Sequence, residues 1–114
     1  MEFLALIHGD EKRWENLGDD ERQAVYQRYI EFAQRDEVVG GAELQPTDAA
    51  TTVRVRNGDR LVTDGPYAEI KEALGGFFIL EADSIDDACQ LAAAIPAAEH
   101  GAIEVRPVYV REES

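Results

Sequence analysis

The stretch GGFFILEA, residues 75–82, carries the strongest indication of fold in this sequence of 114 residues. Its centre, residues 77–80, is a run of large apolar side chains without the alternation that marks a strand with one solvated face. Such a run is typical of a central strand that is covered on both faces of its sheet. The rest of the chain must therefore supply neighbouring strands and the layers that cover them.

Before this stretch, the pattern predicts a strand, a helix and a second strand. Residues 3–8 form a short apolar run typical of a buried strand. Residues 19–36 begin with three acidic residues, which favour a helix start, and carry apolar residues at helical spacing. Residues 38–44 predict a strand, in which Gly40 and Gly41 indicate a bulge or a close approach of another backbone.

The clearest turn in the sequence lies within TTVRVRNGDRLVT, residues 51–63. Asn57 and Gly58 suit the two positive φ values of a type I′ turn, which joins two antiparallel strands. A two-residue turn at this point creates favourable cross-strand pairs, namely Thr52 with Thr63, Val53 with Val62 and Arg56 with Asp59. The sequence therefore predicts a β-hairpin before the central strand.

After the central strand, a second helix and a last strand are predicted. Ser84 begins a capping-box pattern and Pro96 ends an apolar helical stripe, so a helix is expected over residues 84–95. Residues 102–110 predict the last strand, and Pro107 within it indicates an edge position or a bulge. Two β-α-β halves joined by a hairpin predict a ferredoxin-like α+β sandwich.

The sandwich leaves one face of the sheet without a cover, because two helices cover only one face. Residues 77–80 nevertheless call for burial on both faces. A second copy of the chain is the simplest cover for the open face. The sequence therefore predicts a homodimer packed sheet to sheet, with the arrangement of a dimeric α/β barrel.

Composition and charge limit the classes of partner. The chain is long enough for one domain, residues 1–114, and its 11 basic and 24 acidic residues give a net charge of −13. This charge repels nucleic acid and anionic lipid. The sequence lacks a signal peptide and any membrane-spanning stretch, so we expect a cytoplasmic protein. The single cysteine, Cys89, is expected to pack as a small hydrophobic residue.

The stretch TDGPYAEIKEALGG, residues 63–76, is the first candidate for a functional site. Asp64 starts a turn, and a cluster of charged residues follows it. If the chain is helical after the turn, Glu69 and Glu72 share one face, where two carboxylates act as acid and base or bind a hard cation. The plainer alternatives are a turn-capping role for Asp64 and a solvated charged surface for the other residues.

The two histidines, His8 and His100, each lie where a predicted strand meets a loop. Functional residues often occupy such positions, and histidine transfers protons near neutral pH. A structural strand-end role for His8 and a surface-loop role for His100 are the alternatives. Glu104 and Arg106 share one face of the last strand and are expected to form an ion pair. No metal site, cofactor or nucleotide-binding loop is predicted.

Four segments together resemble the YCII-related family in its DGPF-domain branch. They are IHGDE (7–11), TTVRVRNG (51–58), TDGPYAEIKEALGG (63–76) and HGAIEVRP (100–107), with Tyr67 in place of the name-giving Phe. The resemblance implies a dimeric ferredoxin-like, α/β-barrel fold and leaves the activity open.

The resemblance also bears on candidate site residues. In the wider family, a His on the first helix and an Asp before a late Pro suggest an enzymatic dyad. Here the first helix has no His, and Ile95 precedes Pro96. We therefore predict that the protein binds a small molecule, or acts as a cofactor-free enzyme, through residues other than this dyad. The candidates are Asp64 and His100 as catalytic residues, with Tyr67, Glu69, Lys71 and His8 as ligand-binding residues.

The alternative function is a dimeric regulatory module that catalyses no reaction. DGPF-domain proteins tend to be encoded near, or fused to, extracytoplasmic-function sigma factors, so the resemblance implies a link to such a regulator. The acidic surface would then contact a basic patch on its partner.

Overall fold

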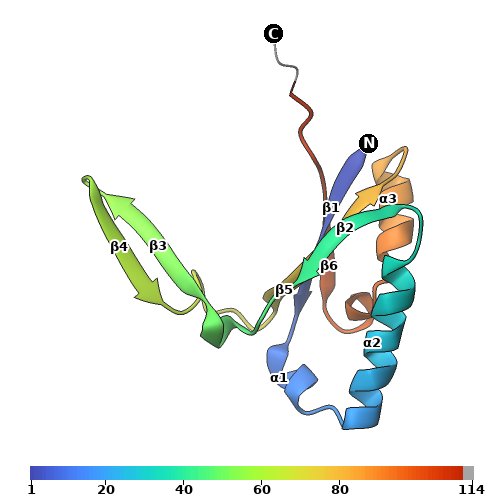
Figure 1. The fold of residues 1–114 in the computed structure, drawn as a ribbon, viewed down its shortest axis with the longest axis horizontal. Coiled ribbons are helices and arrows are strands. Elements are labelled where there is room, and N and C mark those ends of the chain that lie inside the picture. The colour runs from blue at the N-terminus through green and yellow to red at the C-terminus, as the bar shows by residue number, and fades with distance from the viewer. Residues whose placement is uncertain (112–114) are drawn as a thin grey trace.

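The computed structural model describes residues 1–111 of the chain (Figure 1). Its main sheet has four antiparallel strands in the order β2-β5-β1-β6. Strand β5 lies between two neighbours, as its uninterrupted apolar run predicts. The strands are β1 (Glu2–Gly9), β2 (Val38–Glu43), β5 (Ala73–Glu81) and β6 (Ala102–Pro107).

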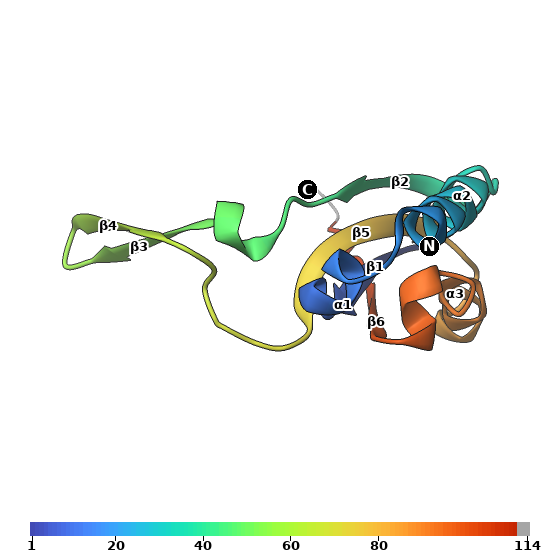
Figure 2. The same ribbon diagram turned by 90° about the horizontal axis from the view of Figure 1, so that it is seen from below.

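Two helices, α2 (Asp19–Ala33) and α3 (Ile85–Ala92), cover one face of this sheet (Figure 2). The element order and the strand order are those of a ferredoxin-like α+β fold, which confirms the prediction. Helix α2 ends at Ala33, three residues before the predicted end at position 36. The Ser84 side chain accepts a hydrogen bond of 3.1 Å from the Asp87 amide, so the predicted cap of α3 is present.

Three short helical segments connect these elements, and the sequence patterns did not reveal them. They are α1 (Glu11–Glu15), η1 (Thr47–Ala49) and η2 (Pro96–Glu99). Asp10 caps α1 by accepting a hydrogen bond of 3.0 Å from the Lys12 amide. A helix of one turn is too short to show an apolar stripe, so periodicity does not detect it.

The core lies between the two helices and the main sheet. Alternation along β1 directs Phe3 and Ala5 toward the helices, where Phe3 is 1% exposed and Ala5 is fully buried. The buried cluster comprises Phe3, Ala5, Phe32, Leu80, Ala88, Ala92 and Ile95. Cys89 is exposed, so the prediction that it packs into the core was wrong. The stripe of α3 is centred on Ala88 and Ala92, and Cys89 lies about 100° around the helix from Ala88.

Gly40 and Gly41 of β2 lie at an irregularity of the strand and at a close approach of another backbone, as the sequence indicated. The register with β5 shifts between Val38 and Gly40, which is the predicted irregularity. A Cβ on Gly41 would lie 2.5 Å from the carbonyl oxygen of Phe77, so the backbones approach closely there. Strand β6 is an edge strand with Pro107 as its last residue, in agreement with the predicted edge position.

Strands β3 (Thr51–Arg56) and β4 (Asp59–Asp64) form a separate two-stranded sheet that projects from the main sheet (Figures 1 and 2). We call residues 51–64 the arm. Its turn has φ values of 52° at Asn57 and 82° at Gly58, and Arg56 pairs with Asp59 as predicted. The chain has a radius of gyration of 16.3 Å. A compact domain of this length has about 13 Å, so the arm extends well beyond the domain body.

No helix among residues 1–111 is both long enough and apolar enough to cross a membrane.

Candidate functional site

The face of the main sheet that points away from α2 and α3, which we call the open face, carries an apolar strip. Because Phe3 and Leu80 point to the helices, their strand neighbours point to the opposite face. The register places Leu4 opposite Ile79 and Leu6 opposite Phe77. These four side chains form the apolar strip, and all four are only partly buried.

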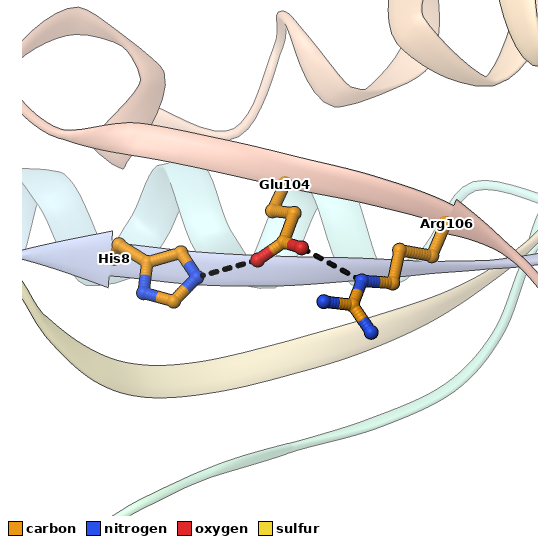
Figure 3. A network of polar contacts seen from close by, with 3 residues as sticks. All are labelled: His8, Glu104 and Arg106. Atoms are coloured by element: carbon orange, nitrogen blue, oxygen red, sulfur yellow. Dashed lines mark hydrogen bonds and ion pairs between the residues drawn. The ribbon is translucent and has the colours of Figure 1, made fainter.

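Three side chains of β1 and β6, His8, Glu104 and Arg106, form a polar cluster (Figure 3). Arg106 donates a hydrogen bond from Nε to Oε2 of Glu104 at 2.7 Å. The other carboxylate oxygen, Oε1, lies 3.2 Å from Nε2 of His8. The antiparallel register of β1 and β6 sets Glu104 opposite Leu6, which places the polar cluster beside the strip. The expected ion pair of Glu104 and Arg106 is thus confirmed, and His8 extends it to a chain of three groups.

The charges of the polar cluster support one another. The Arg106 guanidinium, and after it the His8 imidazole, hold the pKa of Glu104 below its ordinary value of 4.5. The ionised Glu104 therefore holds the His8 ring through Nε2 and favours a proton on that nitrogen. The second ring nitrogen, Nδ1, is then the atom that can exchange a proton with a bound molecule.

The pH dependence of Glu104 tests this arrangement. Because folding lowers its pKa, the stability that Glu104 contributes is present above about pH 4.5 and is lost as the pH falls through the lowered value. We expect the substitution Arg106→Gln to raise the pKa of Glu104 toward its ordinary value, since it removes the largest cause of the shift. Side-chain carboxyl shifts measured by NMR titration would show this, and an unchanged titration midpoint in the variant would contradict the assigned ion pair.

The motif segment, residues 63–76, does not form the helix that was considered from the sequence. Residues 65–72 contain no helix, so Glu69 and Glu72 do not share a helical face. Asp64 is the last residue of β4 and pairs with Thr51. The turn after it is held by backbone and hydroxyl groups: the Gly65 amide donates to the Ala50 carbonyl at 2.8 Å, and the Thr52 hydroxyl donates to the Gly65 carbonyl at 2.8 Å.

The other candidate residues of the motif segment lie on the surface between the arm and β5. Tyr67 is 81% exposed, and the Arg54 guanidinium lies 5.7 Å from the centre of its ring. Glu69 and Lys71 are exposed. The structure therefore places Asp64, Tyr67, Glu69 and Lys71 at the base of the arm, and it links one of them, Tyr67, to an arm side chain.

His100 follows η2 and is exposed. The η2 segment packs against β6, β1 and α2, and β6 lies at the opposite edge of the main sheet from β2, the strand that leads into the arm. Within one chain, His100 is therefore not brought together with Asp64. His8 is the candidate that the fold joins to other ionisable groups. From the sequence, Glu104 and Arg106 were expected only to pair with each other. The signal that connects them to His8 is the pairing of the first strand with the last.

No group of three or more metal-ligating side chains was found within residues 1–111.

Gly101 allows the end of β1 to approach the start of β6. A Cβ at this position would collide with the backbone oxygen of His8. We expect Gly101→Ala to destabilise the protein by about 1–3 kcal/mol, because the backbone must shift to admit the methyl group. Gly9→Ala is the matched control, since its Cβ would meet no atom within 4 Å. Urea unfolding of both variants measures the difference, and equal stabilities would contradict the close contact.

Comparison with known proteins identifies the family of this chain. A family model for the YCII-related domain matches residues 1–112. A protein of Rhizobium meliloti (strain 1021), "Uncharacterized protein R00369", is 36% identical over 118 residues, which cover 95% of this chain and 92% of that relative. The chain therefore belongs to the YCII-related family.

Proposed function

We propose that this protein binds a small molecule on the open face of its main sheet and transfers a proton to or from it without a cofactor. The observation that carries this proposal is the polar cluster beside the apolar strip. Ligand sites typically combine an apolar surface with a few polar groups that converge on it. Histidine held by a carboxylate is a common arrangement for proton transfer near neutral pH.

Each member of the polar cluster has a distinct role in this proposal. His8 accepts a proton at Nδ1 from the bound molecule, which keeps the electron pair of the broken bond while the His8 ring becomes an imidazolium. Glu104 is a positioning residue that holds the ring through Nε2 and stabilises the imidazolium charge, since it lies 3.2 Å away. Arg106 holds Glu104 and is 68% exposed, so its remaining nitrogens can bind an anionic group. The favoured ligand is therefore a small apolar molecule that carries a carboxylate.

The proposal includes a homodimer in which the open face is covered by a second copy. The chain exposes 8483 Å². A folded monomer of 12.7 kDa exposes about 6,200 Å², so this chain exposes about 2,200 Å² more. An excess of this size is comparable with the surface that each chain buries in a homodimer. A dimer would also enclose the polar cluster and exclude water from it.

Chemical-shift mapping tests the site with a defined set of probes. A panel of small aliphatic and aromatic carboxylates is titrated into ¹⁵N-labelled protein. We expect shifts at residues 4–8 and 103–106, and a loss of affinity of about tenfold or more in Arg106→Gln, because a charge-assisted hydrogen bond is removed. Arg35→Gln is the control, since Arg35 contacts Phe32 on the helix side. If no carboxylate shifts these amides, or if both variants bind equally, the proposed site is wrong.

A regulatory interaction module remains the second candidate, and the acidic charge of −13 supports it. In this case a basic surface of a transcription regulator, such as a sigma factor, would bind the chain, and rising salt would weaken the complex. Co-expression of the chain with a sigma factor from the same genome, followed by affinity purification at low and high salt, tests whether the two proteins form a complex. A sigma factor that fails to copurify even at low salt would count against this role.

A further inference from the structure

The arm has an apolar face that nothing within residues 1–111 covers. Val53 and Val62 are a cross-strand pair, and Val55 lies two residues further along the same face. The exposed fractions of Val53, Val55 and Val62 are 58%, 62% and 54%. A lone two-stranded hairpin is at best marginally stable in water. The arm therefore needs a surface to pack against.

The distribution of charge between the arm and the rest of the chain indicates the surface on which the arm packs. The arm holds three arginines and two aspartates, a net charge of +1, so the rest of the chain carries −14. Arg60 pairs with Val55 and so lies on the valine face itself. Two arms would repel one another weakly, whereas an arm and the acidic body of a second copy attract. Charge complementarity thus favours packing of the arm on the body of another copy of this chain.

Shape excludes the chain's own open face as that surface. The arm leaves the main sheet at the end where Leu44 donates to Gly75 at 2.9 Å, and it then points away from the sheet. Strands of six residues extend about 20 Å, enough to cross several strands of a neighbouring sheet. The apolar strip matches the valine face in character, and the polar cluster beside it offers Glu104 as a partner for Arg60.

We propose that the arm of each subunit docks on the open face of its partner, so that the candidate site is built from two chains. The valine face lies on the partner's apolar strip, and Arg60 reaches the carboxylate of the partner subunit's Glu104. The base of the arm then brings Asp64 and Tyr67 to the rim of that site. This inference rests on the proposed dimer, and it explains how Asp64 and Tyr67, which lie at the base of the arm in their own chain, join the partner's site.

Paramagnetic relaxation in mixed dimers tests the docking directly. Unlabelled Asp59→Cys/Cys89→Ser protein carries a nitroxide near the tip of the arm, and it is mixed with ¹⁵N-labelled Cys89→Ser protein. Only contacts between subunits then broaden the observed signals. We expect broadening of the amides of residues 4–8 and 103–106. A nitroxide at Gln90→Cys on α3 is the control and should leave those amides sharp.

The other outcomes each overturn the proposal. Broadening confined to α2 and α3, or confined to the other arm, would place the arm elsewhere. A dimer without any broadening would refute the docking but not the proposed dimer. A monomeric chain would refute both.

A substitution pair provides an independent measurement. The double variant Val53→Ser/Val62→Ser should weaken the dimer at least tenfold in sedimentation experiments, because it removes apolar contact area. Leu61→Ser, 47% exposed on the opposite face of the arm, should weaken it much less. Equal effects of the two variants would contradict the assignment of the valine face.

Discussion

Replacing Leu6 by aspartate is expected to turn a dimer into a monomer. Leu6 lies in the apolar strip, opposite Phe77 on β5 and opposite Glu104 on β6. In the proposed dimer, a new carboxylate at this position would be buried without a cation of its own and would face the existing carboxylate of Glu104. Burying an unpaired charge costs several kcal/mol, so the dissociation constant should rise by about a thousandfold or more.

Sedimentation equilibrium measures this effect, because each chain has a mass of 12.7 kDa and the dimer has twice that mass. Ile30→Asp is the matched control. Ile30 is an apolar residue of α2 that is 51% exposed, so a charge there remains in water and the dimer should persist. A wild-type chain that sediments as a monomer would refute the proposed dimer. A Leu6→Asp protein that stays dimeric would show that the open face is not its interface.

Replacing Leu80 by alanine is expected to be the most damaging substitution for folding. Leu80 is fully buried, and the register places it between Phe3 on β1 and Val38 on β2. Truncation removes apolar contacts and leaves a cavity in a core of few residues, which costs about 2–5 kcal/mol. Since a domain has about 5–15 kcal/mol of stability, this loss is a large fraction of the total.

Urea unfolding at one fixed protein concentration measures the change, because the proposed dimer would make apparent stability depend on concentration. Leu61→Ala provides the comparison, since Leu61 is 47% exposed on the arm. We expect the comparison variant to lose less than about 1 kcal/mol, because little area is removed from contact. Similar losses in the two variants would show that the core does not depend on Leu80.

The parts of the fold that the sequence predicted well are those that depend on neighbouring residues. Asn57 and Gly58 define the turn locally, and a two-residue turn leaves only one register for the strands beside it. Ser84 caps its helix within one turn as predicted, although α3 ends at Ala92, three residues before the end expected from Pro96. The uninterrupted apolar run of residues 77–80 pointed to the central strand because successive side chains of a strand point to opposite faces, so consecutive apolar residues call for burial on both faces; β5 does lie between two neighbours.

Predictions failed where several conformations fit the same local pattern. The charged residues after Pro66 suit a helix or an irregular connection equally well, and the structure contains the latter. The chain must there link the projecting arm to β5, and this requirement comes from the fold as a whole. Cys89 lies beside the apolar stripe of α3, and only the position of the sheet decides which side of that stripe is buried.

By itself, the sequence determined the family, the α+β class, the central strand and the arm with its register, since these depend on short-range patterns of apolar and turn residues. The tertiary structure alone decided that His8 meets Glu104, 96 positions away along the chain. The physical reason is the strand order, which pairs β1 with β6 and so sets two distant side chains on the same face of the main sheet. The same topology separates the arm from the open face of its own chain.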